Sequence, residues 1–455
     1  APAADVPPID LVPTALGHIA DQFDAEWGGF GGAPKFPSTM TLDLFVRTVA
    51  LGLDHEGTAR NIVDTSLTAM ASGGMYDHIG GGFARYSVDQ QWLVPHFEKM
   101  LYDQALLVRL YAHATSAFAN PVYAQVVDET IGYVLRDLRH PDGGFYSAED
   151  ADSPDEHGHG HEGLFHTWTT AEVRDVLSDD AHVALDWYEF TDTGNFEGRT
   201  IPSRLRHRGD LLRPAAVEHA RQRLFAARER RRRPGLDDKV VTEWNALMLA
   251  SLSEAAALFG RADWAQAAIA NGEFLMRELR TTDGRWMRTW HPDGRPKARH
   301  MALAADHAAL IDAFTRLGEL TGEARWTTLA VEVADTLLLH FWDHESGGVF
   351  TTADDGEQLV VRQKDLLDNA TPGANSSTAL AFLRLAALTG EQRFGHHADQ
   401  ILRLLASTMQ QAPSAFAQAL GALWMRHAGF TEVVVSGDRP DLVSTVQRRW
   451  WPHLV

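Results

Sequence analysis

The sequence contains no cysteine, and this absence removes several classes of protein at once. Without cysteine the chain has no disulfide framework, no thiolate nucleophile and no thiolate metal site. Any thiol redox chemistry must therefore come from outside this chain.

Basic residues and long apolar runs are also scarce. The 455 residues include 61 acidic and 41 basic side chains, a formal net charge of −20. Such a surface repels phosphate backbones and anionic lipid, so we expect neither nucleic acid nor a membrane as partner. No run of eighteen apolar residues occurs, and residues 1–5 lack the charged and apolar regions of a signal peptide. We expect a cytoplasmic protein.

Glycine-rich turns divide the chain into similar units. A glycine turn followed by an aromatic or β-branched residue recurs five times, and each copy lies between two helical segments. The repeating unit is helix, glycine turn, short extended loop, helix. The copies are residues 24–30, 77–83, 141–146, 283–287 and 344–350.

Polar-faced helices alternate with helices that are apolar nearly all round. Residues 244–259 carry only Glu254 as a charge, and residues 378–389 carry only Arg384. A helix without a polar face is buried on every side, whereas a polar-faced helix lies outside. We expect outer helices near 10–25, 56–74, 122–139, 263–280, 324–341 and 392–411, and inner helices near 40–53, 98–118, 239–259, 303–321, 372–389 and 414–427.

Six outer helices alternating with six inner ones predict an all-α fold. It is an (α/α)6 barrel of six helical hairpins, with short β-hairpin loops at one mouth. An open superhelical solenoid is the alternative. We expect the barrel to span residues 1–427, with an insertion at 150–238 whose Arg-rich stretch, 228–233, is a solvated helix face. Residues 428–455 form a tail with one isolated strand at 431–437, and because a lone strand needs a partner, we expect this tail to be cut short.

The glycine loops all lead into inner helices, which gathers polar and aromatic residues at one mouth of the barrel. Helix N-termini attract carboxylates and oxygen-rich ligands. Aromatic rings stack on the C–H faces of a pyranose while carboxylates and amides bind its hydroxyls, so we expect a sugar or oligosaccharide ligand. The candidate substrate-binding residues are Lys35, Arg85, Tyr86, Asp89, Trp92, Asp152, Glu243, Trp244, Asn245, Asp306 and Asn375.

The segment that starts at Pro95 supplies the first candidate catalytic groups. We expect Pro95 in a first helical turn, with Glu98 where the helix dipole favours negative charge. His96, Lys99 and Asp103 then share one stripe of this helix. His96, Glu98 and Asp103 would reach one ligand, and the alternative is a capped helix start with an internal Lys99–Asp103 pair.

Three acidic residues after the third glycine turn supply further catalytic candidates. Strand alternation sends Glu149 to one side and Asp150 and Asp152 to the other. Carboxylates so close raise one another's pKa, which makes a general acid at neutral pH. An acidic loop that closes a turn is the alternative.

His307 is the last catalytic candidate. It follows Asp306 at the start of an inner helix, where a carboxylate orients an imidazole for proton transfer, and a core histidine is the alternative. The histidines within 157–161 alternate with glycines, which do not favour a fixed metal geometry. The dinucleotide fingerprint at 158–163 lacks a preceding strand. We therefore expect no metal and no cofactor.

Five long motifs, residues 28–37, 80–89, 94–104, 143–152 and 194–197, resemble the spermatogenesis-associated, thioredoxin-domain-containing protein family. The resemblance spans essentially the whole chain. It implies a six-hairpin-glycosidase-like barrel, related in shape to N-acylglucosamine 2-epimerases and normally preceded by a thioredoxin-like domain. It therefore implies that this chain is the carbohydrate-enzyme-like portion of a longer protein.

The chain departs from the family pattern at three places: residues 161–163, residues 243–246 and His307, where the family usually has tyrosine. Epimerases of the related fold use two histidines as acid and base, and the last inner helix offers only His427, at its far end.

Three functions follow from these residues. One is a sugar epimerase or isomerase using His96 or His307 with Glu98, Asp103 or Glu149. Another is a glycoside hydrolase using two of the carboxyls of Asp103, Glu149, Asp150 and Asp152. The third is a non-catalytic barrel that binds a glycan or a partner domain.

Overall fold

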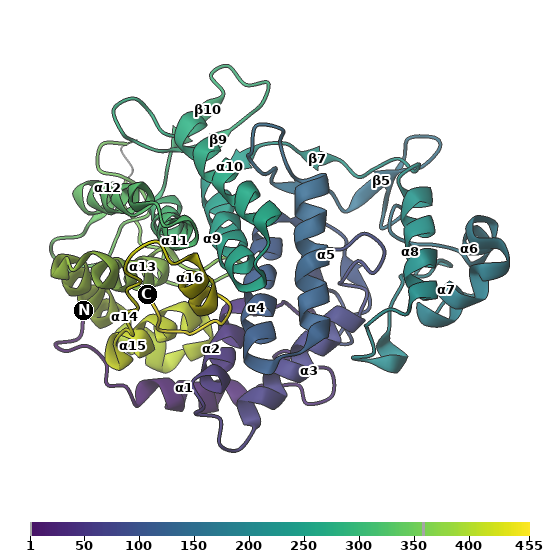
Figure 1. Cartoon of the computed structure of the whole chain (residues 1–455), viewed down its shortest axis with the longest axis horizontal. Coiled ribbons are helices and arrows are strands. Elements are labelled where there is room, and N and C mark those ends of the chain that lie inside the picture. The colour runs from purple at the N-terminus through teal and green to yellow at the C-terminus, as the bar shows by residue number, and fades with distance from the viewer. Residues whose placement is uncertain (1, 357–359) are drawn as a thin grey trace.

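The computed structural model describes residues 2–356 and 360–455, and in this part of the chain six apolar helices form an inner ring (Figure 1). These helices lack a hydrated face because they touch the lumen on one side and other helices on the other; α9 buries 14 of its 18 residues. Each packs on the next, and α15 packs on α2, so the ring is closed and the solenoid is excluded. The inner helices are α2 (Thr39–Ala50), α4 (Leu101–Phe118), α9 (Thr242–Phe259), α11 (Ala304–Thr321), α13 (Ala374–Thr389) and α15 (Ala417–Ala428).

The outer helices pack around this ring, one against each inner helix. In α5, Val127, Ile131 and Val134 are buried while Asp128 and Arg136 are exposed, as the sequence periodicity predicts. The predicted (α/α)6 barrel is therefore confirmed. Within the described residues the outer helices are α1 (Leu11–Ala20), α3 (Thr58–Ser72), α5 (Pro121–Asp137), α10 (Ala262–Glu278), α12 (Ala324–Phe341) and α14 (Gln392–Gln411).

Each predicted glycine turn joins the end of an outer helix to the segment that leads into the next inner helix. The turns close β-bridges, as between Tyr76 and Phe83. Gly81 shows why glycine is needed: its φ is +79°, and a Cβ would lie 2.3 Å from the carbonyl oxygen of Glu129. The turns therefore gather at the mouth where the inner helices begin.

Three of these turns are each locked by a lysine whose side chain is largely buried. In each, an aspartate accepts backbone N–H groups of the turn with one oxygen and a lysine ammonium with the other, and the same ammonium donates to a glycine carbonyl. Charge-assisted bonds of this kind are strong. The three sets are Asp24, Lys35 and Gly28; Asp77, Lys99 and Gly81; Asp343, Lys364 and Gly347.

A buried amide side chain ties three turns to the inner helices. In each case one amide group accepts from the N–H and donates to the C=O of the residue after the glycines, so both backbone groups are satisfied. The pairs are Gln104 with Phe83, Asn245 with Phe145, and Asn375 with Val349.

Short strands fill the connections into the inner helices. The helix expected to begin at Pro95 begins at Leu101 instead, because Pro95–His96 and Lys99–Met100 pair with other strands. The two-stranded and three-stranded sheets are β1 (Tyr86–Ser87) with β2 (Pro95–His96); β3 (Lys99–Met100) with β4 (Ala148–Glu149) and β7 (Leu236–Asp237); β5 (Asp152–Pro154) with β6 (Gly160–Glu162); and β8 (Val240–Val241) with β9 (Met287–Trp290) and β10 (Ala298–Met301).

The segment 150–238 stands out from the barrel beside α5 (Figure 1). Its helices α6 (Thr170–Leu177), α7 (Ala181–Trp187) and α8 (Ala215–Arg228) pack around a small core of their own. The solvated helix face expected at 228–233 is wrong. Arg228 is buried against Asp77 at 2.8 Å and Arg233 lies 3.0 Å from Asp137, so these two arginines attach the segment to the barrel. Arg231 lies 3.7 Å from the Trp168 ring centroid, within the segment itself.

The C-terminal tail differs from the sequence prediction. Residues 431–437 form no strand; Thr431 makes a single parallel bridge with Leu454, and the Val433 N–H donates to the Val455 carbonyl. The helix α16 (Pro440–Gln447) follows this stretch.

The tail covers the end of the barrel opposite the mouth. It hydrogen-bonds to Ser116, Phe259 and Glu319 in the last turns of α4, α9 and α11. The Trp450 ring stacks on His113 with centroids 3.8 Å apart, so the tail reaches side chains of the lumen.

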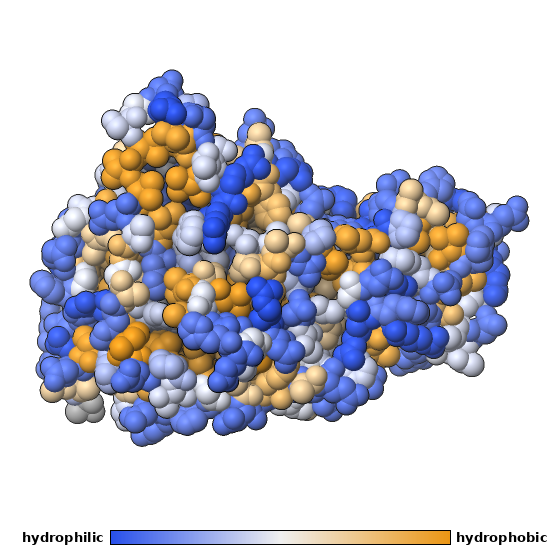
Figure 2. All heavy atoms as spheres, turned by 60° about the horizontal axis from the view of Figure 1, so that its bottom comes forward, coloured by the Kyte–Doolittle hydropathy of each residue, from blue (hydrophilic) through white to orange (hydrophobic). Residues whose placement is uncertain are grey.

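Figure 2 shows a surface on which hydrophobic residues form separate patches between hydrophilic ones. In the described part of the chain, no helix has the length and apolar character needed to cross a membrane.

Candidate functional site

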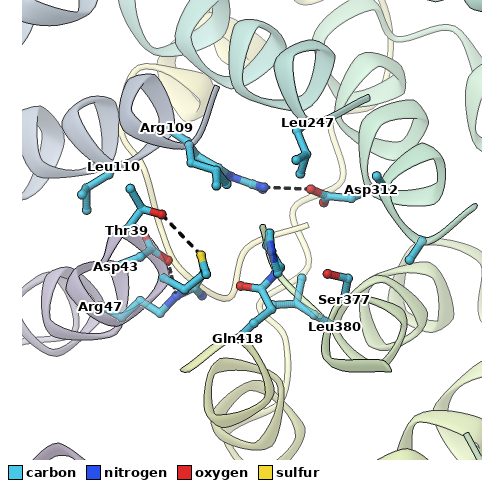
Figure 3. Close-up of a pocket in the computed structure, with 15 residues that line it drawn as sticks. Thr39, Asp43, Arg47, Arg109, Leu110, Leu247, Asp312, Ser377, Leu380 and Gln418 are labelled. Carbon is cyan, nitrogen blue, oxygen red and sulfur yellow. Dashed lines mark hydrogen bonds and ion pairs between the residues drawn. The ribbon is translucent and has the colours of Figure 1, made fainter. Parts of the chain in front are cut away.

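The barrel lumen contains a narrow cavity just below the mouth (Figure 3). Its volume of about 50 Å³ suits a few water molecules and not a sugar ring, so a bound sugar would lie above it, at the mouth. Every inner helix contributes to the lining, which includes Thr39, Asp43, Leu106, Arg109, Leu247, Ala309, Asp312, Ser377, Leu380 and Gln418.

Buried ion pairs fill the lumen deeper along the inner helices. The Glu254 carboxylate is central: its oxygens lie 2.6 Å from Arg109 Nε, 3.1 Å from Arg316 and 3.5 Å from His113 Nε2. Burial raises the pKa of Glu254, but Arg109 and Arg316 outweigh it and hold that pKa well below its usual range. The network, which we call the lumen network, also includes Asp43, Arg47, Asp312, Glu319 and Arg384.

The lumen network was not predicted as a functional feature. Its signal in the sequence is the single charge on an otherwise apolar helix, Glu254 in α9 and Arg384 in α13. A charge on a helix that is buried all round needs a buried partner, and the lumen is where the inner helices meet.

Asp103 is a buried carboxyl at the mouth, in the first turn of α4. Its Oδ2 atom has no hydrogen-bond partner among the described residues. Burial raises the pKa of Asp103 well above 3.8; the Arg85 guanidinium opposes this rise and Glu98 adds to it. This direction favours the protonated carboxyl, the form that a general acid requires.

Glu243 is a second buried carboxyl at the mouth, in the first turn of α9. Burial raises the pKa of its neighbour Asp306 as well, but Asp306 accepts from the N–H groups of Glu243 and Leu303 and from Arg288. These donors favour the negative charge on Asp306 over one on Glu243. Burial and this charge raise the pKa of Glu243 to about 7, although Arg288 lies 3.6 Å away. Glu243 thus exchanges its proton near neutral pH.

The two carboxyls belong to one mouth. Asp103 lies one helical turn from Leu106, and Glu243 lies one turn from Leu247, and both leucines line the cavity. The Tyr102 and Trp244 rings join the two helices edge to face, with centroids 5.0 Å apart. The mouth therefore combines aromatic rings with two carboxyls whose pKa values are raised.

Glu243→Gln is expected to stabilise the fold at high pH only. Because the folded pKa of about 7 exceeds the ordinary 4.5, stability is lost as pH rises between these values, by about 3 kcal/mol in all. Glutamine mimics the neutral carboxyl and removes this loss. The apparent melting temperatures of both proteins, measured at pH about 5 and about 9, test the sign. If the melting temperatures of wild type and Glu243→Gln differ by the same amount at both pH values, the pKa of Glu243 is not raised.

Glu98 lies close enough to Asp103 for its charge to act on that carboxyl. His96 is on β2 and Glu98 is in the link between β2 and β3, not on the predicted helical stripe. His96 Nδ1 is 2.9 Å from Glu162, and its Nε2 is 3.6 Å from Glu98. Glu98 also pairs with Arg85 at 3.3 Å. The structure therefore brings the first three catalytic candidates together, and it adds Glu162 from β6.

The predicted mutual pKa rise of the acidic loop is wrong. Glu149 is buried against Tyr133 and Arg233, while Asp150 and Asp152 are exposed. Burial raises the pKa of Glu149, but the charges of Arg233 and Lys99 lower it below 4.5 overall. Glu149 is an ionised partner of the insertion's arginines, which does not fit a general acid.

Several predicted substrate-binding residues hold the loops of the mouth. Lys35 is 1% exposed and locks the first glycine turn, and Trp92 is buried with its Nε1–H donating to Trp27. Asp89 accepts three backbone N–H groups of its own loop. With the amide residues Asn245 and Asn375, these side chains have structural roles.

His307 is a core histidine, the alternative left open by the sequence. Its ring is buried beside Phe341, and its Nδ1 lies 2.8 Å from the Leu303 carbonyl. Burial lowers its pKa to about 4, so it stays neutral.

Two residues of the mouth were missed. Arg288 on β9 pairs with Asp306, and its polar place in a short strand is the only sequence signal. Asp368 accepts the N–H groups of Gly373 and Gln418 at the starts of α13 and α15, and burial raises its pKa to about 6.

The chain is similar in sequence to spermatogenesis-associated protein 20 of human and mouse. The human protein is 34% identical over 461 residues, which cover 93% of this chain and 59% of that protein. The mouse protein is 32% identical over 460 residues, covering 92% and 58%. The chain thus spans about three fifths of the length of these curated relatives. No family model matches it.

Solved structures share the fold at low sequence identity. Cellobiose 2-epimerase from Bacillus thermoamylovorans has a TM-score of 0.57 at 9% identity, over 88% of this chain and 87% of that one. D-mannose isomerase has a TM-score of 0.57 at 10% identity, over 92% of this chain and 96% of that one. The family 76 α-mannanase of Bacteroides thetaiotaomicron has a TM-score of 0.55 at 9% identity, over 92% of this chain and 94% of that one. The chain therefore has the (α/α)6 fold of these sugar-processing enzymes.

Proposed function

We propose that this chain is a carbohydrate-active enzyme in which Asp103 and Glu243 act as general acid and base. The observation that carries the proposal is the pair of buried carboxyls with raised pKa values on neighbouring inner helices. A raised pKa keeps a carboxyl protonated to higher pH, so that it can give a proton to a sugar oxygen. The sugar-processing enzymes that share the fold support a sugar as the substrate.

Glycoside hydrolysis is the reaction that these two carboxyls support best. Asp103 donates its proton to the leaving glycosidic oxygen, and ionised Glu243 takes a proton from the water that attacks the anomeric carbon. The half-buried Trp244 ring offers an apolar face to the sugar. Arg288 and Asp306 hold Glu243 in place, since Asp306 accepts the backbone N–H of Glu243.

Sugar epimerisation or isomerisation is the second candidate, and His96 is the observation that favours it. Its imidazole is half-buried and held between the carboxylates of Glu98 and Glu162. An imidazole held in this way is oriented to accept or donate a proton, with Asp103 as the partner acid. His307 takes no part because its ring is buried in the core.

For the whole protein we propose membership of the spermatogenesis-associated family, with a thioredoxin-like domain as partner of the barrel in the cytoplasm. The sequence identity to the human and mouse relatives supports this proposal. About two fifths of the length of these relatives lies outside the match, which is room for a further domain such as the thioredoxin-like one.

A screen of neutral sugars and oligosaccharides in deuterated water tests the function. New reducing ends support hydrolysis, and solvent deuterium at C2 of the sugar supports epimerisation. Binding without either product contradicts the enzyme proposal and favours a glycan-binding barrel. A preparation purified in the same way from cells that lack this chain serves as the control, because turnover in that preparation comes from another enzyme.

A further inference from the structure

Three aromatic rings form a column on the rim of the mouth. The Phe36 ring stacks on Tyr86, with centroids 4.9 Å apart and planes 29° apart. The Tyr86 ring in turn lies next to the His96 ring, with centroids 5.2 Å apart and planes 30° apart. Phe36 is 49% exposed, whereas most aromatic side chains of the described chain are buried. Phe36, at one end of the column, therefore has ring surface available to a ligand.

The column is rigid because both of its ends are fixed by backbone pairing. Lys35 and Ser87 exchange two backbone hydrogen bonds, of 2.8 and 2.9 Å, which place Phe36 beside Tyr86. Tyr86 and His96 are cross-strand partners in β1 and β2. A ligand that stacks on a pre-arranged ring loses little free energy to ordering of the site.

The column is joined to the proposed acid through one carboxylate. Glu98 Oε2 lies 3.6 Å from His96 Nε2 and 3.3 Å from Arg85 Nη1. Arg85 is the guanidinium that acts on the pKa of Asp103. A ligand that spans from Asp103 to the column thus passes Glu98, whose oxygens can accept sugar hydroxyls.

We propose that Phe36, Tyr86 and His96 form a sugar-binding platform for a second pyranose ring of a neutral oligosaccharide. The inference rests on the proposed function, because the first ring is the one held at Asp103. Aromatic faces pack on the C–H faces of a pyranose, and adjacent carboxylates take its hydroxyls. Glu98 and Glu162 beside His96, on a chain of net charge −20, disfavour uronic acids and sugar phosphates.

Phe36→Ala tests the platform by calorimetric titration with cellotriose, mannotriose, maltotriose and chitotriose and with their monosaccharides. We expect about tenfold weaker trisaccharide binding and unchanged monosaccharide binding, a loss equivalent to one stacking contact. Phe36→Trp should restore binding, because it keeps a ring. Leu339→Ala, which truncates a side chain that is 70% exposed on α12, is the matched control and should leave trisaccharide and monosaccharide binding unchanged.

Each outcome decides the platform separately from the enzyme proposal. Trisaccharide binding that is equal in wild type and Phe36→Ala overturns the platform, even if hydrolysis is observed. Loss of binding in Phe36→Ala without turnover in wild type keeps the platform and rejects the enzyme. If wild-type protein binds no trisaccharide, the platform is rejected, and Phe36 is then better explained as a protein contact.

Discussion

Asp103→Asn is expected to lower kcat on the sugar substrate by about 10²–10⁴-fold, the usual contribution of a general acid. Asparagine has nearly the shape and the neutral charge of the protonated carboxyl, so the buried site keeps its packing. It cannot release a proton to the leaving oxygen. The measurement is kcat and KM on the substrate found in the screen, and we expect KM to change little.

Asp142→Asn is the matched control for this prediction. Asp142 lies in the third glycine turn with a side chain 60% exposed, and the same substitution there should leave kcat unchanged. If Asp103→Asn retains activity within about twofold of wild type, Asp103 is not the acid, and the His96 alternative gains support.

The barrel could be predicted from the sequence because its physics is local. A helix that is apolar all round has to be surrounded, so the pattern of α9 and α13 fixes their place in the inner ring. The glycine turns could be placed for the same reason, since a positive φ at positions such as Gly81 is a property of the residue itself.

The start of α4 could not be predicted, because distant strands decide it. Proline and a following glutamate are typical of a helix start, yet β2 and β3 pair with β1 and β4. This pairing turns Lys99 to Asp77 and leaves Asp103 without the lysine partner that a helix start would give it. Sequence separation hides such pairings, and local preference then predicts the wrong element.

The charges that act on the candidate acids also come from far along the chain. Arg233 reverses the predicted rise in the pKa of Glu149, and Asp306 adds to the rise in the pKa of Glu243. The residue types at the mouth were therefore predictable, while their protonation was not. Only the packed structure determines whether a carboxyl has a cation beside it.

Glu254→Gln is expected to destabilise the fold by about 3–5 kcal/mol, the cost of breaking a buried ion pair on one side. The substitution keeps the shape of the side chain but leaves Arg109, Arg316 and His113 without their shared carboxylate. When these three buried donors face a neutral amide, the fold loses more stabilising free energy than when a surface ion pair is broken, because water cannot replace the missing charge. Chemical denaturation at neutral pH measures the loss.

Glu273→Gln on α10 is the matched control, since Glu273 pairs with Arg325 on the surface, where such pairs contribute about 0–1 kcal/mol. The double variant Glu254→Leu, Arg109→Leu should be less destabilised than the sum of its single variants, because it removes both charges of one pair. Equal effects of Glu254→Gln and Glu273→Gln would show that the lumen is hydrated enough to screen its charges. In that case the lumen network would not be needed to hold the inner helices together.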